Sequence, residues 1–212
     1  SSSSPGISLK QEGISYIAGA ELPAVVVNIV RAGPGLGGIL PAQGDYFQAT
    51  KGGGHGDYRN LVIAPASVQE MASLTSTAFD LADKYRMPAM ILADGTLGQM
   101  MEPVAFRDEE PIVEVAKPWA CTGRGDREFH NTVTSIYIDP DTLEAKNIEL
   151  QDKYKVIEEN EVRYEMIDCD DADYVIVAFG SSARIGMKTM EMAREEGIKV
   201  GLLRPITLFP FP

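Results

Sequence analysis

The chain has 212 residues, 44% of them hydrophobic and 8% aromatic, a composition typical of a globular protein that can bury a core. Its net charge of −12 argues against nucleic acid and anionic membrane surfaces as partners, because both attract basic patches. The sequence has no apolar run long enough to span a membrane and no signal peptide at its N-terminus, so we expect a cytoplasmic protein.

The N-terminal residues 1–22 predict a helix that follows a turn of serine, proline and glycine. Its apolar residues share one face: Ile7, Ile14 and Ile17. Because the first N–H groups of a helix have no internal partner, such a turn can hold a polar ligand. Ser4 is therefore a candidate cofactor-binding residue. A linker without function is the alternative.

A continuously apolar stretch, Val25–Val30, predicts a buried parallel strand that ends at Arg31. Nine of the 20 glycines follow between Gly33 and Gly56, a density that suits a backbone approached closely by a ligand or a partner. Ligands of open parallel sheets bind at the carboxyl ends of the strands. We therefore predict the functional centre at this strand end.

Arg31 at the strand end and His55 in the glycine-rich stretch are candidate catalytic residues, and Gly33 and Gly35 are candidate cofactor-binding residues. A planar guanidinium at a strand end suits a small carboxylate, although a structural ion pair is the alternative role. His55 could act near the reaction centre, but a lone loop histidine is more often a surface residue.

The glycines Gly33, Gly35 and Gly38 also match the dinucleotide-binding spacing. The prolines on either side of them leave no place for the helix of that motif, so we do not expect a nicotinamide or flavin site.

Residues 60–95 predict two strands with a helix between them. The helix, residues 67–86, begins with a capping box of Ser67 and Glu70. The short connections make this a βαβ unit, which predicts a parallel sheet.

The remaining chain divides into an acidic segment and a second βαβ unit. Residues 107–173 hold 8 basic and 19 acidic groups, a net charge of −11. They predict an extended connection followed by one long helix that begins at Asp139 or Asp141, has Tyr164 in its apolar stripe and ends near Ile167. Strands are expected at 174–179 and 200–204. We therefore predict domains at 1–106 and 172–212, joined by an acidic connector at 107–171.

Two cysteines, Cys121 and Cys169, lie far apart and share no C-x-x-C spacing. The sequence therefore predicts no iron–sulfur cluster and no metal site in this chain.

Three stretches together resemble the α subunit of 2-oxoacid:ferredoxin oxidoreductases: NIVRAGPGLGGILPAQGDYFQATKGGGHGDYRNLVIAPASVQEM, MPAMILADG and VAFGSSARIGMKTMEMAREEGIKVGLLRPITLFPFP. The resemblance covers essentially the whole chain and is greatest to the branched-chain, or 2-oxoisovalerate, type.

The resemblance implies an α/β fold made of an incomplete pyrimidine-binding domain for thiamine diphosphate and the start of a transketolase C-terminal-like domain. It implies oxidative decarboxylation of a 2-oxoacid to acyl-coenzyme A with electrons passed to ferredoxin, and it puts Arg31 at the position that contacts the substrate carboxylate. Thiamine diphosphate is shared with a β subunit, while magnesium and iron–sulfur clusters belong to partner subunits. The expected partners are the β subunit, a γ subunit and a ferredoxin-like subunit in a hetero-oligomer.

Two features of the family are missing from the chain: the N-terminal Tyr-Pro-Ile-Thr-Pro-like turn and the glutamate that hydrogen-bonds the aminopyrimidine. We therefore expect a fragment truncated at both ends and inactive on its own. The alternative functions are a 2-oxoglutarate-type or other thiamine-dependent transketolase-like subunit, and a non-catalytic assembly subunit.

Overall fold

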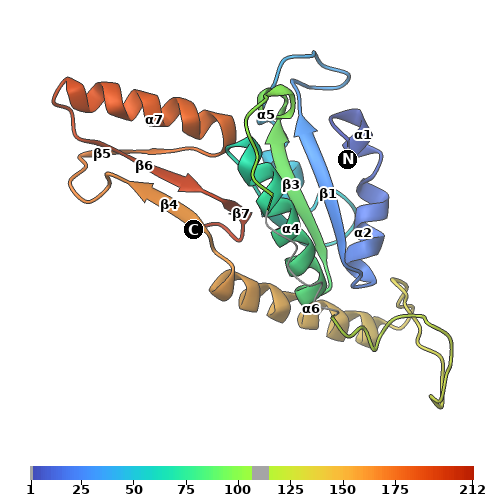
Figure 1. Ribbon diagram of the computed structural model, residues 1–212. Helices are drawn as coiled ribbons and strands as arrows, with labels where there is room; N and C mark the ends of the chain where they lie inside the picture. Colours follow the sequence, from blue (N-terminus) through green and yellow to red (C-terminus); the bar gives the residue numbers. More distant parts are fainter. Residues whose placement is uncertain (1, 107–114) are drawn as a thin grey trace.

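The computed structural model describes residues 2–106 and 115–212 and contains two β-sheets flanked by helices (Figure 1). The first sheet has the strand order β1 (Ala24–Val30), β3 (Pro88–Asp94), β2 (Leu61–Ile63), β7 (Thr207–Phe209). The second has the order β4 (Tyr164–Ile167), β6 (Val200–Pro205), β5 (Tyr174–Val177).

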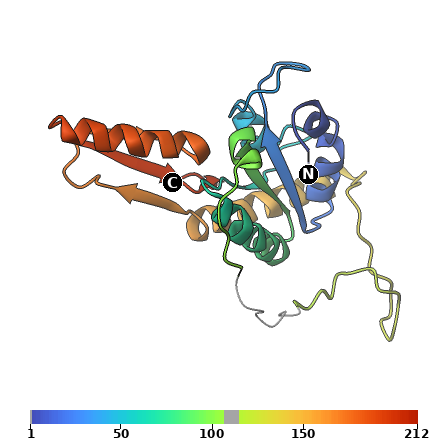
Figure 2. The same cartoon turned by 45° about the horizontal axis from the view of Figure 1, so that its top comes forward.

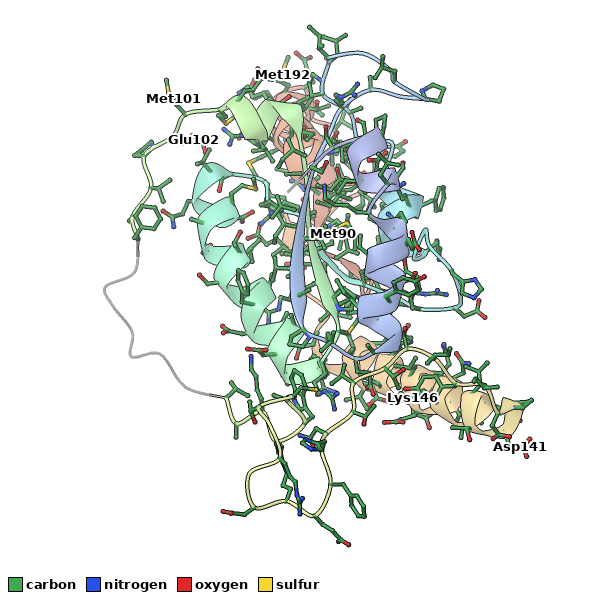
Figure 3. All side chains as sticks on the ribbon, turned by 90° about the vertical axis from the view of Figure 1, so that its right-hand side faces the viewer. Met90, Met101, Glu102, Asp141, Lys146 and Met192 are labelled. Atoms are coloured by element: carbon green, nitrogen blue, oxygen red, sulfur yellow. The ribbon has the colours of Figure 1, made fainter. Side chains whose placement is uncertain are left out.

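Seven helices accompany these strands in the described residues: α1 (Pro5–Ser8), α2 (Gln11–Gly19), α3 (Tyr46–Thr50), α4 (Val68–Tyr85), α5 (Gly95–Gln99), α6 (Pro140–Asn160) and α7 (Gly180–Glu195). Alternate residues of β3 divide the first core into two layers. Ala89 and Ile91 pack toward α4 and α6, whereas Met90 and Leu92 pack toward α2 and α3. Figure 3 shows Met90 between the sheet and α2. The first sheet is therefore covered on both faces.

The βαβ prediction is confirmed, because β2 and β1 both pair with β3 in parallel. The predicted cap of α4 also forms: the Ser67 hydroxyl accepts a hydrogen bond from the Glu70 N–H at 3.1 Å. The Glu70 carboxylate reaches back to the N–H of Ala66 at 2.7 Å, one residue before the position that a capping box uses. At the N-terminal end of α4, the Glu102 carboxylate, labelled in Figure 3, accepts a hydrogen bond from the N–H of Val68 at 2.9 Å.

Two predictions about the N-terminal part are wrong in detail. The expected single helix is two, because Leu9 and Lys10 separate α1 from α2, and Pro5 begins α1 instead of preceding a longer helix. The strand β1 was expected to be buried, but it lies at the edge of the sheet and most of its residues are half-buried. Within residues 2–106 and 115–212, its outer side pairs only through a bridge between Ser2 and Asn28.

The long acidic helix is shorter than predicted. It begins at the Asp139 cap but ends at Asn160, and Tyr164 belongs to strand β4, which pairs antiparallel with β6. Part of the connection predicted before this helix, residues 107–114, lies outside the described residues. Three apolar residues of α6 enter the core beneath α4: Leu150, Tyr154 and Ile157. The helix is thus a structural part of the first sheet's core.

A half-buried ion cluster fastens α6 to the turn before β1. The Glu21 carboxylate accepts hydrogen bonds from Lys146, labelled in Figure 3, and from Lys153 at 2.5 Å. Burial alone would raise the pKa of Glu21, but the two lysine hydrogen bonds outweigh it and hold this pKa below its ordinary value. Glu21 is therefore ionised at neutral pH and ties α6 to the domain.

The second sheet is covered by α7 on one face. Leu202 and Met190 form its small core, whereas Met166, Val175 and Val177 are exposed. Residues 115–139 extend away from both sheets (Figure 2). None of the described helices is both long enough and apolar enough to cross a membrane.

Candidate active site

Arg31 lies where the sequence places it, directly after β1 at the carboxyl edge of the first sheet. In the register of the two strands, Val30 stands beside Asp94, the last residue of β3. The chain then makes a loop and returns, so that Pro41 forms an antiparallel bridge with Arg31. We call residues 32–45 the glycine loop.

The glycine loop is closed by its own backbone. The Ala32 N–H donates to the Leu40 carbonyl at 2.8 Å, and the Gly38 N–H donates to the Ala32 carbonyl at 2.8 Å. Gly37 has a φ of +63°, and a Cβ there would lie 1.8 Å from the Ala32 oxygen. Glycine is therefore required at position 37 by both conformation and space.

Arg31 has a structural role through hydrogen bonds to backbone carbonyls. Its Nη1 donates to the carbonyls of Leu36 and Gly38, the latter at 2.8 Å, so the guanidinium holds the glycine loop in shape. For Nε and Nη2, the described residues supply no hydrogen-bond acceptor. Part of the guanidinium can therefore still donate to a bound anion.

A cavity of about 250 Å³ lies on one side of Arg31. Its lining contains four predicted site residues: Ser4, Arg31, Gly33 and Gly35. Asp45 also lines this cavity and accepts a hydrogen bond from Asn28 at 3.1 Å. The Ser4 hydroxyl oxygen is buried and has no hydrogen-bond partner among the described residues. Because an unpaired buried hydroxyl costs free energy, Ser4 is suited to a polar ligand.

A second cavity, of about 360 Å³, lies on the other side of Arg31. Two isoleucines, Ile29 and Ile39, line it together with Ser2, Ser3, Gly95 and Gln99. Among the described residues, Arg31 is the only charged one in this lining. The arginine thus lies between a polar cavity and one with an apolar component.

His55 lines neither of these cavities. It is exposed on the turn Gly52–Gly56, which rests on Tyr58: the Tyr58 hydroxyl donates to the Gly52 carbonyl at 2.7 Å and accepts from the Gly54 N–H at 3.1 Å. Burial raises the pKa of Tyr58, so it remains a neutral donor. A catalytic role for His55 stays a prediction from the sequence.

Two residues near Arg31, Gln43 and Asp94, were not among the site residues predicted from the sequence. Asp94 is 2% exposed and caps α5 by accepting from the Thr96 N–H at 2.8 Å. The sequence did contain a signal for Asp94. Arg31 follows one predicted parallel strand and Asp94 ends another, and the carboxyl ends of parallel strands meet at one edge of a sheet. Gln43 had no such signal, because its partners lie at the start of α7, about 140 residues further along the chain.

A larger cavity, of about 450 Å³, lies between α4 and α7. Its buried Arg204 is paired with Glu70 at 2.8 Å and with Glu165 at 2.9 Å. These charges satisfy one another, whereas Ser4 and Arg31 have unused hydrogen-bonding groups. We therefore place the candidate site at Arg31. Within residues 2–106 and 115–212, no group of three or more His, Cys, Asp or Glu side chains is arranged to hold a metal.

Two family models match the chain. The model described as pyruvate flavodoxin/ferredoxin oxidoreductase, thiamine diphosphate-binding, matches residues 1–168. The model of pyruvate:ferredoxin oxidoreductase core domain II matches residues 172–212.

Curated proteins and a solved structure are also similar to the chain. The ketoisovalerate oxidoreductase subunit VorB of Methanothermobacter thermautotrophicus is 61% identical over 211 residues, which cover 100% of this chain and 60% of that protein. The 2-oxoglutarate synthase subunit KorA of Methanocaldococcus jannaschii is 32% identical over 99% of this chain and 63% of its own length. The chain therefore spans about 60% of the length of these relatives. A 2-oxoglutarate:ferredoxin oxidoreductase structure from Magnetococcus marinus shares the fold, with a TM-score of 0.79 and 24% identity over 100% of this chain and 42% of that chain.

Proposed function

The chain belongs to the pyruvate flavodoxin/ferredoxin oxidoreductase family, and we propose that it is part of a subunit of a thiamine-diphosphate-dependent 2-oxoacid:ferredoxin oxidoreductase. The family membership and the α/β fold agree with the resemblance deduced from the sequence. The proposed reaction is the oxidative decarboxylation of a branched-chain 2-oxoacid to its acyl-coenzyme A, with electrons passed to ferredoxin. The observation that carries the proposal is Arg31, with unused donors, at a strand end between two cavities.

Arg31 is proposed to bind the substrate carboxylate. The hydrogen bonds from Nη1 to the loop carbonyls already fix the orientation of the guanidinium, and with it the orientation of Nε and Nη2. Substrate binding therefore costs little further side-chain entropy. A charge-assisted hydrogen bond to a carboxylate is stronger than a neutral one. The arginine thereby orients the 2-oxoacid at the carboxyl edge of the sheet.

The cavity lined by Ile29 and Ile39 favours a substrate with an apolar side chain. A 2-oxoglutarate side chain carries a second carboxylate, which needs its own cationic partner when it is buried. Apart from Arg31, the described lining of this cavity offers none. The names of the relatives at 61% and 59% identity, both ketoisovalerate oxidoreductase subunits, support the same choice.

The polar lining of the 250 Å³ cavity, which includes Ser4 and Arg31, is suited to part of thiamine diphosphate. The unpaired Ser4 hydroxyl can hydrogen-bond a polar ring atom, and Gly33 and Gly35 let a ring approach the backbone. When bound, this cofactor supplies the carbon nucleophile and the electron sink of the reaction. We propose that a β subunit holds its diphosphate and magnesium, and that iron–sulfur clusters belong to a ferredoxin-like subunit beside a γ subunit.

We also propose the division into a pyrimidine-binding-like domain at 1–106, a connector at 107–171 and a transketolase C-terminal-like domain that starts at 172. The connector is shared between the domains, because α6 packs into the first core while β4 joins the second sheet.

The glycine loop is the proposed contact with the β subunit. Its three large apolar side chains are exposed to solvent: Leu36 by 78%, Ile39 by 89% and Leu40 by 70%. A cluster of exposed apolar side chains on a loop that carries a functional residue fits an interface better than a free surface.

Hydrogen exchange checks this contact. We expect amide exchange through Gly33–Gly56 to slow when the β subunit is added, because a docked partner excludes water and restrains the loop. Residues of α6 distant from the loop serve as the internal control. Equal exchange of the loop with and without the β subunit would count against the interface.

Substrate preference tests the function. We expect the complete protein, assembled with its partners, to reduce ferredoxin only when thiamine diphosphate and coenzyme A are present. Its kcat/KM should be at least roughly tenfold higher for 2-oxoisovalerate than for 2-oxoglutarate, since an unpaired buried carboxylate is strongly disfavoured. The opposite preference would establish the 2-oxoglutarate type, and activity without thiamine diphosphate would overturn the proposed class. A non-catalytic assembly subunit would leave the partners' activity unchanged when Arg31 is replaced.

A further inference from the structure

The return side of the glycine loop is attached to the helix α7, about 140 residues further along the sequence. The amide of Gln43 uses both its ends: Nε2 donates to the Phe179 carbonyl at 2.9 Å, and Oε1 accepts from the Ser182 hydroxyl at 2.9 Å. Phe179 is the N-cap residue of α7, and Ser182 lies in its first turn. One side chain of the loop therefore recognises the start of this helix.

Three further contacts surround this attachment. The Ser181 hydroxyl donates to the Asp94 carboxylate at the end of β3. The ring of Tyr46 lies 6.0 Å from the ring of Phe179. Gly180 has a φ of +58°, and a Cβ there would lie 3.1 Å from Gln43 Nε2, so the close approach depends on glycine. The first turn of α7 thus docks onto the carboxyl edge of the first sheet.

Backbone pairing connects the segment that carries Gln43 to Arg31. Pro41 bridges Arg31, and the Ala42 N–H donates to the Val30 carbonyl at 3.4 Å. Gln43 follows directly. The tip of the glycine loop, residues 33–41, is exposed and is held by its own hydrogen bonds and by Arg31. The position of that tip therefore depends on how its return side is anchored.

We propose that Gln43 is a positioning residue through which the second sheet and α7 fix the glycine loop and hence the guanidinium of Arg31. The inference rests on the proposed function for the role of Arg31, but the coupling between α7 and the loop is a property of the fold. The two hydrogen bonds need both a donor and an acceptor on residue 43. A glutamate of similar size can accept from Ser182 but cannot donate to the Phe179 carbonyl.

The test compares Gln43→Ala and Gln43→Glu with the control Arg184→Ala in the complete protein. Arg184 also leads from α7 to the first sheet's domain, where it contacts the Ala66 carbonyl at 3.3 Å and Glu102 at 2.7 Å, but it does not touch the loop. Hydrogen exchange of residues 32–40 is measured first, without substrate. The KM and kcat of the assembled enzyme for the 2-oxoacid are measured second.

We expect both Gln43 variants to exchange the Ala32 and Gly38 amides roughly tenfold faster, and Arg184→Ala to leave them unchanged. KM should rise roughly tenfold in both Gln43 variants while kcat changes little, because substrate orientation is affected and the cofactor chemistry is not. Unchanged loop exchange in both variants would overturn the coupling. Faster exchange with an unchanged KM would support the coupling and overturn the role of Arg31 in binding the substrate.

Discussion

Replacement of Arg31 by alanine in the complete protein is expected to lower kcat/KM for the 2-oxoacid by roughly tenfold to a hundredfold. A hydrogen bond to a charged group contributes about 1.5–3 kcal/mol, and the loss of the carboxylate contact removes at least one. The variant also loses the bonds from Nη1 to the Leu36 and Gly38 carbonyls, so part of the effect comes from a looser loop. Steady-state kinetics with the 2-oxoacid varied at saturating coenzyme A measure the change.

Two controls separate these contributions. Arg31→Gln keeps an N–H donor for the loop carbonyls but removes the charge, so it should retain slow exchange of the loop while losing activity. Arg127 likewise donates to backbone carbonyls of its own glycine-containing turn, but it lines neither of the two cavities beside Arg31. Arg127→Ala should leave kcat/KM unchanged. Wild-type kinetics in folded Arg31→Ala would refute the assignment.

Replacement of Ile157 by alanine is expected to lower the free energy of unfolding by about 2–5 kcal/mol, the range for large-to-small substitutions in a packed core. Ile157 is fully buried and shares a cluster with Leu61 and Leu81 on the α4 side of the first sheet. Urea denaturation followed by circular dichroism measures the change.

Ile148 on the same helix is the matched control, because its side chain is 56% exposed. Ile148→Ala should change the free energy of unfolding by less than about 0.5 kcal/mol. Equal small effects of both substitutions would mean that α6 is a peripheral connector in solution.

The elements predicted correctly are those whose pattern is local. The capping serine and the apolar face of α4 lie within a few turns of each other, and the short connections on either side are sufficient to imply a parallel pair. The same reasoning placed Arg31 at a strand end, and the structure brings Ser4, Gly33 and Gly35 into the same cavity.

The wrong predictions concern elements whose structure depends on residues far away in the sequence. Tyr164 continues the apolar spacing of α6, but the backbone of β4 pairs with β6 some 40 residues later, and this pairing ends the helical pattern. The edge position of β1 likewise depends on which strands surround it, which no stretch of β1 itself encodes. Gln43 is the extreme case, since its partners are the N-cap residue of α7 and a residue of the first turn of that helix.

The strand β7 has a consequence for how this polypeptide acquires its structure. It pairs with β2 although Ile63 and Thr207 are about 145 residues apart in sequence, so this edge of β2 has no partner until the chain has been synthesised beyond residue 207. Closing so long a loop is slow, and an unpaired edge strand is prone to pair with another chain meanwhile. We therefore expect a growing chain of this protein to be most prone to aggregation through β2 before residues 207–209 join the sheet.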